Sequence, residues 1–410
     1  MRVAPAPRWR PGRRAMGIPA GIAVWVAATF LVLGLITTCL LVALAAASAG
    51  RLLTRRTTIG ALLPGQRWLV GALGLLLAWL SLSLLWARDP GMAWSNLGLW
   101  CLAGVVLVLV SATIERPESV KLVVVGFVIG ALASVIIGAA EGSASSLAGR
   151  FAGTEGDPNG LAAALVPAGV LAAALLADAG GWVVRGTWAG IVAVLAIGLA
   201  ATHSRGGFLA AGVLLPVLPF VFRRHQRRLW GLVALAVCLA GTWYALSPGA
   251  LRQEAGLRDG GDGRSTLWLV AWRMAKDSTP EGVGLNNFRV ASPGYENRPG
   301  ALRYVEQIDH AHVVHNTYLQ LLAETGIVGL SLFLAVVAAC LGAAHRAAAW
   351  FERSGRGALA NLARAVMLAG FAGSVAQVFL SNGYDPRYWF LLALGPALWG
   401  IALRSDPARS

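Results

Sequence analysis

Histidines cluster where a polar segment meets an apolar one, in the run Asp309-His310-Ala311-His312-Val313-Val314-His315-Asn316. Because 57% of the chain is hydrophobic and only 13% is charged, imidazoles at such a boundary are costly unless they have a function. An imidazole can take a proton from a hydroxyl near neutral pH, so His315 is a candidate general base. His203, His310 and His312 remain alternatives for the same proton transfer.

Two other interpretations of these histidines are compatible with the sequence. The pattern His-x-His-x-x-His supplies enough nitrogens for zinc, but His310 would not share a helical face with His312 and His315. No nearby carboxylate or cysteine completes a convincing ligand set, so we expect no metal. A structural histidine bonded to the backbone is the second alternative.

Two arginines lie in glycine-rich turns, Arg205 in His203-Ser-Arg-Gly-Gly207 and Arg264 in Gly260-Gly-Asp-Gly-Arg-Ser265. A guanidinium keeps its charge and offers a planar fork of donors that matches phosphate oxygens. Backbone amides at a helix start after Arg264 could add to such an anion site. Two arginines on one face would suit a pyrophosphate. Arg205 could instead contact lipid headgroups, and Arg264 could lie in a solvent loop.

Further polar turns are candidates for substrate contacts. Arg150 precedes Asp157-Pro158-Asn159, where Asp157 or Asn159 is suited to cap a helix. Arg387 follows a similar turn, Tyr384-Asp-Pro, and is a further candidate for ligand contact. Glu324, an acid within an apolar run, is expected to form hydrogen bonds inside the helix bundle.

The elements that position these residues are apolar runs, and a mean hydropathy of +0.66 indicates an all-α, polytopic helical membrane protein. The block 18–49 is too long for one helix, so we predict a short hairpin. The other predicted spans are 67–86, 96–114, 120–140, 160–177, 182–201, 207–222, 229–247, 313–343, 365–383 and 388–403. The sequence therefore predicts about twelve membrane helices.

Arginine-rich loops predict the orientation. The formal net charge is +15, but the arginines lie in short loops between apolar runs, so we expect membrane lipids rather than nucleic acid as partners. These loops fall on one side, which makes both termini cytoplasmic. The opposite face receives the loops 87–95, 141–159, 202–206 and 384–387 and one long segment.

Domain organisation follows from this topology. We predict an N-terminal bundle over 1–247, a long outer loop domain over 248–312 and C-terminal membrane helices over 313–410. Within the loop, Thr266 to Asp277 is amphipathic with Trp268 and Trp272 four residues apart, which predicts an interfacial helix.

Four motifs occur in order: His203-Ser-Arg-Gly-Gly, Gly263-Arg264-x-x-x-Trp268, Gly282-Val-Gly-Leu-Asn-Asn-Phe288 and His315-Asn-Thr-Tyr-Leu-Gln-Leu-Leu-Ala-Glu-Thr-Gly-Ile-Val-Gly329. Together they resemble the O-antigen ligase and polymerase family of bacterial inner-membrane glycosyltransferases, which have a C-type fold. The resemblance covers roughly 150–330 by motif and the whole chain by topology. Each motif is weak alone, but four around one long outer loop are specific for the family.

The resemblance implies an enzyme at the periplasmic face of the bacterial inner membrane. Such enzymes transfer a glycan from an undecaprenyl-pyrophosphate carrier to an acceptor hydroxyl without a nucleotide sugar, cofactor or required metal. By motif, Arg205 and Arg264 would bind the donor pyrophosphate and His315 would activate the acceptor. Arg150, His203, His312, Asn316 and Arg387 are the further residues that we expect to contact substrate.

The sequence is compatible with three functions: ligase, polymerase and transporter. A single dominant outer loop favours the ligase, which joins O-antigen to the lipid A core, over a polymerase that joins lipid-linked repeat units. A transporter or flippase would also have twelve helices but should show intramembrane charges and repeat symmetry. The predicted spans are nearly free of charge, so we favour an enzyme.

Overall fold

The computed structural model describes residues 17–31, 43–44, 63–142, 150–222, 226–227, 230–231, 234, 264–296 and 313–405. Within these residues the secondary structure is helical, with no strand, and seven helices are long and apolar enough to cross a membrane. The all-α polytopic fold is confirmed. The predicted span 229–247 and the second half of the hairpin 18–49 fall largely outside the described residues, so the number twelve stays a prediction.

Most helices follow the predicted spans, but α16 begins at Gly357, eight residues before the predicted 365, and ends at Ala376, seven before the predicted 383. The longer ones are α1 (Gly17–Thr29), α4 (Arg67–Leu82), α5 (Pro90–Thr113), α6 (Pro117–Ala140), α7 (Pro158–Asp178), α8 (Trp182–Ala201), α9 (Arg205–Val221), α12 (Arg264–Asp277), α15 (Thr317–Arg353), α16 (Gly357–Ala376) and α17 (Pro386–Arg404). Short helices are η2 (Ser83–Leu85), α13 (Phe288–Ala291), α14 (Pro293–Glu296) and η5 (Gln377–Phe379).

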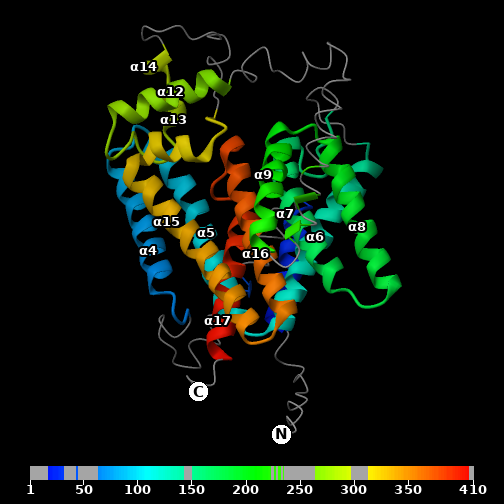
Figure 1. The fold of residues 1–410 in the computed structure, drawn as a ribbon. Coiled ribbons are helices and arrows are strands. Elements are labelled where there is room, and N and C mark those ends of the chain that lie inside the picture. Colours follow the sequence, from blue (N-terminus) through cyan, green and yellow to red (C-terminus); the bar gives the residue numbers. More distant parts are fainter. Residues whose placement is uncertain are drawn as a thin grey trace.

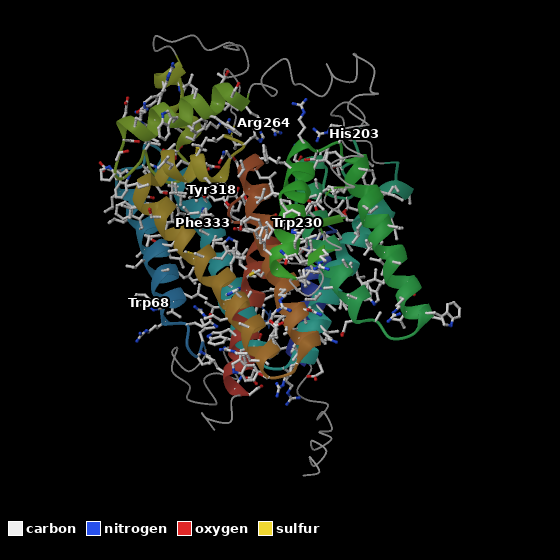
Figure 2. All side chains as sticks on the ribbon, viewed as in Figure 1. Trp68, His203, Trp230, Arg264, Tyr318 and Phe333 are labelled. Atoms are coloured by element: carbon white, nitrogen blue, oxygen red, sulfur yellow. The ribbon has the colours of Figure 1, made fainter. Side chains whose placement is uncertain are left out.

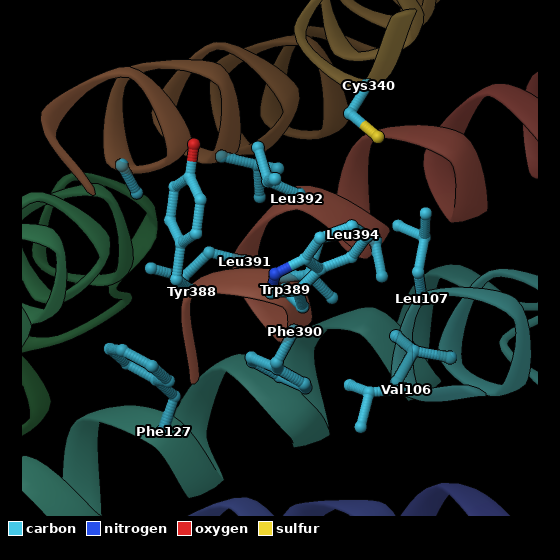
Figure 3. Close-up of a cluster of buried hydrophobic side chains, with 14 of the residues drawn as sticks. Val106, Leu107, Phe127, Cys340, Tyr388, Trp389, Phe390, Leu391, Leu392 and Leu394 are labelled. Carbon is cyan, nitrogen blue, oxygen red and sulfur yellow. The ribbon is translucent and has the colours of Figure 1, made fainter. Parts of the chain in front are cut away.

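Helix α17 forms the centre of the bundle. It packs against α5, α15 and α16, so helices from both sides of the long loop share one core (Figure 1). Its side chains Tyr388 to Leu394 are buried among α5, α6 and α15 (Figure 3). The Phe390 ring stacks on Phe127 with centroids 5.7 Å apart. This rigid centre supports the turns at both of its ends.

Two of the expected helix caps are present. Asp157 accepts hydrogen bonds from the backbone amides of Asn159 and Gly160 at 2.9 and 3.1 Å, and begins α7. Asp385 accepts from the amide of Arg387 at 2.7 Å and begins α17. Each carboxylate satisfies amides that have no partner within the helix.

Helix α15 contains a break. Gly326 has φ 66° and ψ −169°, so the helical segments before and after it are separate within the range Thr317–Arg353. The sequence did not predict this break, and it also predicted an end near 343, ten residues early. The small and apolar residues after 343 continue the helix to Arg353.

Helices α12, α13 and α14 lie at one end of the bundle, across the start of α15 (Figure 1). Helix α12 buries Leu267, Val270 and Met274, and exposes Trp272. The amphipathic helix predicted over Thr266–Asp277 is therefore present, beginning two residues earlier. We call the end that carries α12 the outer end.

Candidate active site

The turn between α8 and α9 presents a histidine and an arginine at the outer end. Ser204 is 1% exposed and caps α9 by accepting a hydrogen bond from the Gly207 amide at 3.2 Å. His203 and Arg205, on either side of this buried serine, are both exposed. The helix start beneath them adds the partial positive charge of its free amides. This turn is therefore suited to an anion.

Arg150 supports this turn from the neighbouring loop. Its Nε donates to the Thr202 carbonyl at 2.9 Å, and its Nη2 donates to Asn159 Oδ1 at 3.1 Å. Ser204 Oγ donates to the same oxygen of Asn159 at 2.9 Å. The structure thus places Arg150 against the backbone of the His203 turn. Its direct contact with substrate stays a prediction.

His315 begins α15 in the same way that His203 begins α9. Both histidines have left-handed backbone angles, with φ 52° and 47°, and each is followed by the residue that caps the helix. Asn316 Oδ1 accepts from the amides of Tyr318 and Leu319 at 3.0 and 3.1 Å. Asn316 is 7% exposed, so the structure gives it a capping contact. His315 is partly exposed above it.

Arg264 is the first residue of α12 and is partly exposed. Figure 2 shows Arg264 and His203 at the same end of the bundle, while Trp68 marks the opposite end. His310 and His312 lie outside the described residues. Among the residues that are described, no three histidine, cysteine, aspartate or glutamate side chains form a metal-binding group.

The short helix η5, which follows α16 directly, joins these three helix starts. The Phe379 ring lies 6.4 Å from the ring of Trp268, one turn beyond Arg264. The same side chain packs so closely on Gly206 that a Cβ there would lie 2.8 Å from Phe379 Cβ. Gly206, the neighbour of Arg205, and Trp268, one turn from Arg264, thus both pack near one phenylalanine.

Helix α15 reaches the same segment through Thr317. Its Oγ1 lies within donating distance of two acceptors, Gln377 Oε1 at 2.7 Å and the Leu380 carbonyl at 2.8 Å. The segment 377–380, which we call the junction, therefore contacts the starts of α9, α12 and α15. No sequence motif predicted the junction. Its one signal was Gln377, a polar residue within the predicted span 365–383.

Arg387 has protein partners on several sides. It forms ion pairs with Glu155 and with Asp385, where Nη2 lies 2.8 Å from Oδ2, and its guanidinium lies 5.3 Å from the centre of the Phe30 ring. Burial raises the pKa of Asp385, but the contacts with Arg387 outweigh this effect and hold the pKa below its usual value. Burial raises the pKa of Glu155. Arg387 is therefore an internal counter-ion, and its contact with ligand stays a prediction.

Two small cavities lie inside the outer end. One of about 30 Å³ is lined by Gln377, Asn382, Asp385 and Arg387, and one of about 10 Å³ is lined by Thr317, Glu324 and Tyr384. Cavities of these sizes hold one or two water molecules. Neither has room for a sugar, so the exposed residues His203, Arg205, Arg264 and His315 form the better candidate site.

Apolar helices around one cation-bearing end define a polytopic membrane protein with its candidate chemistry at one surface. Residues 190–334 match the family model described as O-antigen ligase, and this range contains His203, Arg205, Arg264 and His315. We therefore assign residues 190–334 to the O-antigen ligase family, as the sequence motifs predicted. Arg150, Arg387 and the junction lie outside the matched range. A comparison with curated proteins gives no match.

Proposed function

We propose that this protein is a membrane glycosyltransferase that transfers O-antigen polysaccharide from undecaprenyl-pyrophosphate to the lipid A core. The observation that carries this proposal is the position of Arg205, Arg264 and His315. All three lie in the range that matches the O-antigen ligase family model. Arg205 and Arg264 begin α9 and α12, His315 precedes the cap of α15, and these three helix starts meet at the junction. A lipid-linked donor and a hydroxyl acceptor suit a site that is exposed at one end of an apolar bundle.

The proposed reaction breaks the bond between the anomeric carbon and the pyrophosphate oxygen. Negative charge develops on the leaving pyrophosphate, and two guanidiniums stabilise it more in the transition state than in the ground state. The acceptor oxygen attacks from the opposite face and forms the new glycosidic bond, while its proton passes to His315. The anomeric configuration is inverted. The donor's own phosphate bond drives the transfer without a nucleotide.

Charge at the two ends of the bundle supports a periplasmic site. At the end opposite α12, the helix ends and short loops carry Arg67, Arg116, Lys121, Arg185, Arg346, Arg353, Arg356, Arg364 and Arg404. Basic loops are retained in the cytoplasm. Gly126 and Gly130 of α6 pack on Ala23 and Ala27, so α1 runs parallel to α6 and begins at the basic end, where α17 finishes. These features support a proposed orientation in which Gly17 and Arg404 face the cytoplasm of a bacterial inner membrane.

Deletion of the gene in its host tests this proposal. The strain is complemented with wild type or Arg205→Ala, and its lipopolysaccharide ladder is compared with its pool of lipid-linked glycan. A bare lipid A core with long chains on the carrier, rescued only by wild type, supports the ligase. A core that carries a single repeat unit indicates the polymerase, and an unchanged ladder contradicts both.

A transporter is distinguished by a second variant in the same strain. His315→Ala should abolish the glycan product while donor binding persists if the protein is an enzyme. Slowed appearance of a normal product would indicate a carrier instead.

A further inference from the structure

Glu324 places a carboxylate at the break in α15. Its side chain is buried, with the residue 2% exposed. Oε2 accepts from the Asn286 amide at 2.9 Å, and Oε1 accepts from the Phe288 amide and from Gln320 Nε2, both at 3.2 Å. Two of these three donors belong to the backbone of another segment. The carboxylate therefore joins α15 to the segment Gly282–Phe288, which we call the docking segment.

The break in α15 makes this contact possible. Interruption at Gly326 leaves the carbonyls just before it without their usual helical donors. The Ala323 and Glu324 carbonyls accept instead from the amides of Val283 and Gly284, at 3.0 and 2.8 Å. Trp79 Nε1 donates to the Thr325 carbonyl at 2.8 Å. The docking segment thus completes the hydrogen bonding of the interrupted helix.

Close packing fixes the position of the docking segment. A Cβ on Gly326 would lie 1.7 Å from the Pro280 carbonyl oxygen, and one on Gly282 would lie 2.4 Å from the Glu324 backbone. On its other side, Asn287 Oδ1 accepts from the Asp89 amide at 2.6 Å. The segment is held between α15 and the connection from α4 to α5.

The docking segment also fixes the two elements that carry the candidate chemistry. It follows the turn at the end of α12, in which the Gly282 amide donates to the Ser278 carbonyl at 2.7 Å. One buried cluster contains Leu267 of α12, Val283 of the docking segment and Val314, the neighbour of His315. Arg264 and His315 therefore lie on two elements that share one small core, and Phe288 of that core donates its amide to Glu324.

We infer that Glu324 is a positioning residue that sets the distance between Arg264 and His315. This inference rests on the proposed function, in which Arg264 binds the donor pyrophosphate and His315 activates the acceptor. Glu324 is buried and holds three N–H donors, so it acts through the docking segment rather than on the substrate. A reacting group displaced by about 1 Å can lose on the order of 100-fold in rate.

Glu324→Gln tests the inference because an amide cannot accept from all three donors. The first measurement is hydrogen–deuterium exchange of the full-length protein in detergent. Peptides that cover 282–288 should exchange faster in Glu324→Gln and be unchanged in Glu281→Gln. Glu281 is an exposed carboxylate one residue before the docking segment, so it is the matched control. Unchanged exchange in Glu324→Gln would overturn the docking role.

The second measurement is polysaccharide transfer in membranes of the deletion strain, with the host's own lipid-linked glycan as donor. Glu324→Gln should lower the rate by about 10- to 100-fold and Glu281→Gln should not. In an Arg264→Ala background, Glu324→Gln should add little, because a positioning residue has nothing left to position. If the double variant instead loses transfer rate by the product of the two single-variant losses, Glu324 does not act through Arg264.

Two outcomes separate this inference from the proposed function. If Arg264→Ala alone leaves transfer unchanged, the donor role of Arg264 fails, whatever the exchange experiment shows. If Glu324→Gln does not accumulate as folded protein, Asn287→Ala replaces it, since Asn287 holds the docking segment from its other side. Asn287→Ala should then speed exchange at 282–288 and slow transfer, and normal exchange with normal transfer would overturn the inference.

Discussion

At the scale of single residues, the outer end exposes arginine and histidine side chains and buries the groups that hold them. Ser204 and Asn316 are buried caps, whereas their neighbours His203, Arg205 and His315 reach the surface. A left-handed residue immediately before each cap turns the chain sharply, and few residues other than glycine adopt this conformation. The conformational cost at two histidines is consistent with a site where orientation matters.

Arg205→Ala should lower polysaccharide transfer by about 100- to 1,000-fold, the usual cost of removing one donor to a developing negative charge. Arg205→Lys should recover only part of the loss, because an ammonium keeps the charge but lacks the planar fork. Arg364→Ala is the control, since Arg364 pairs with Glu352 at the opposite end of the bundle. Transfer is measured in membranes that contain equal amounts of each variant. Wild-type transfer by Arg205→Ala would remove Arg205 from the site.

The two histidines can be separated by the same assay. His315→Ala should reduce transfer to background while the membranes still bind the lipid-linked donor, because the proton acceptor is lost and the arginines remain. His203→Ala should retain measurable transfer, since His203 belongs to the donor turn. The reverse result would assign the proton transfer to His203.

At the scale of the elements, much of the fold could be predicted. Apolar runs located α6, α7 and α8 to within three residues, and a capped proline explains why α5 begins at Pro90, six residues before the predicted 96. The break at Gly326 could not be predicted from hydropathy, because apolar residues continue on both sides of it. Its cause is the docking segment, more than thirty residues away in sequence.

Only the exposed residues of the candidate site could be predicted from the sequence. Glycine-rich turns and histidines drew attention to Arg205, Arg264 and His315, since their residue types suit anions and proton transfer. The junction residues Phe379 and Gln377 act through packing and hydrogen bonds to helices far away in sequence. No local pattern marks such a role, so only the three-dimensional structure reveals it.

Gly206→Ala tests the junction at this scale. The new Cβ would lie 2.8 Å from Phe379, so the start of α9 must shift against η5. We expect transfer to fall by about tenfold, as for a small displacement of a reacting group. Gly212→Ala in the same helix is the matched control, because nothing lies within 4 Å of its Cβ. There alanine should cost nothing, or stabilise the helix by about 1 kcal/mol. Equal transfer by both variants would show that the contact with Phe379 does not position Arg205.

At the scale of the whole molecule, the polar turns gather at one end, while most basic residues of the described helix ends lie at the other. The outer turns at Asp89, Arg150, Ser204 and Arg387 are linked to neighbouring outer segments by hydrogen bonds or ion pairs. Under the proposed function, this arrangement separates the site for the lipid-linked glycan from the basic loops that determine orientation. A bundle inserted the other way would expose the site to a compartment without lipopolysaccharide acceptor.

The orientation is tested with single cysteines in a variant in which Cys39, Cys101, Cys238 and Cys340 are replaced by alanine. Glu281→Cys lies at the outer end and Ser354→Cys follows α15 at the basic end, and both positions are exposed. A membrane-impermeant maleimide should label Glu281→Cys in intact spheroplasts and label Ser354→Cys only after lysis. The background variant without cysteines controls for other reactive groups. Labelling in the opposite order would place the arginines and histidines of the site in the cytoplasm, and a periplasmic transferase would then be untenable.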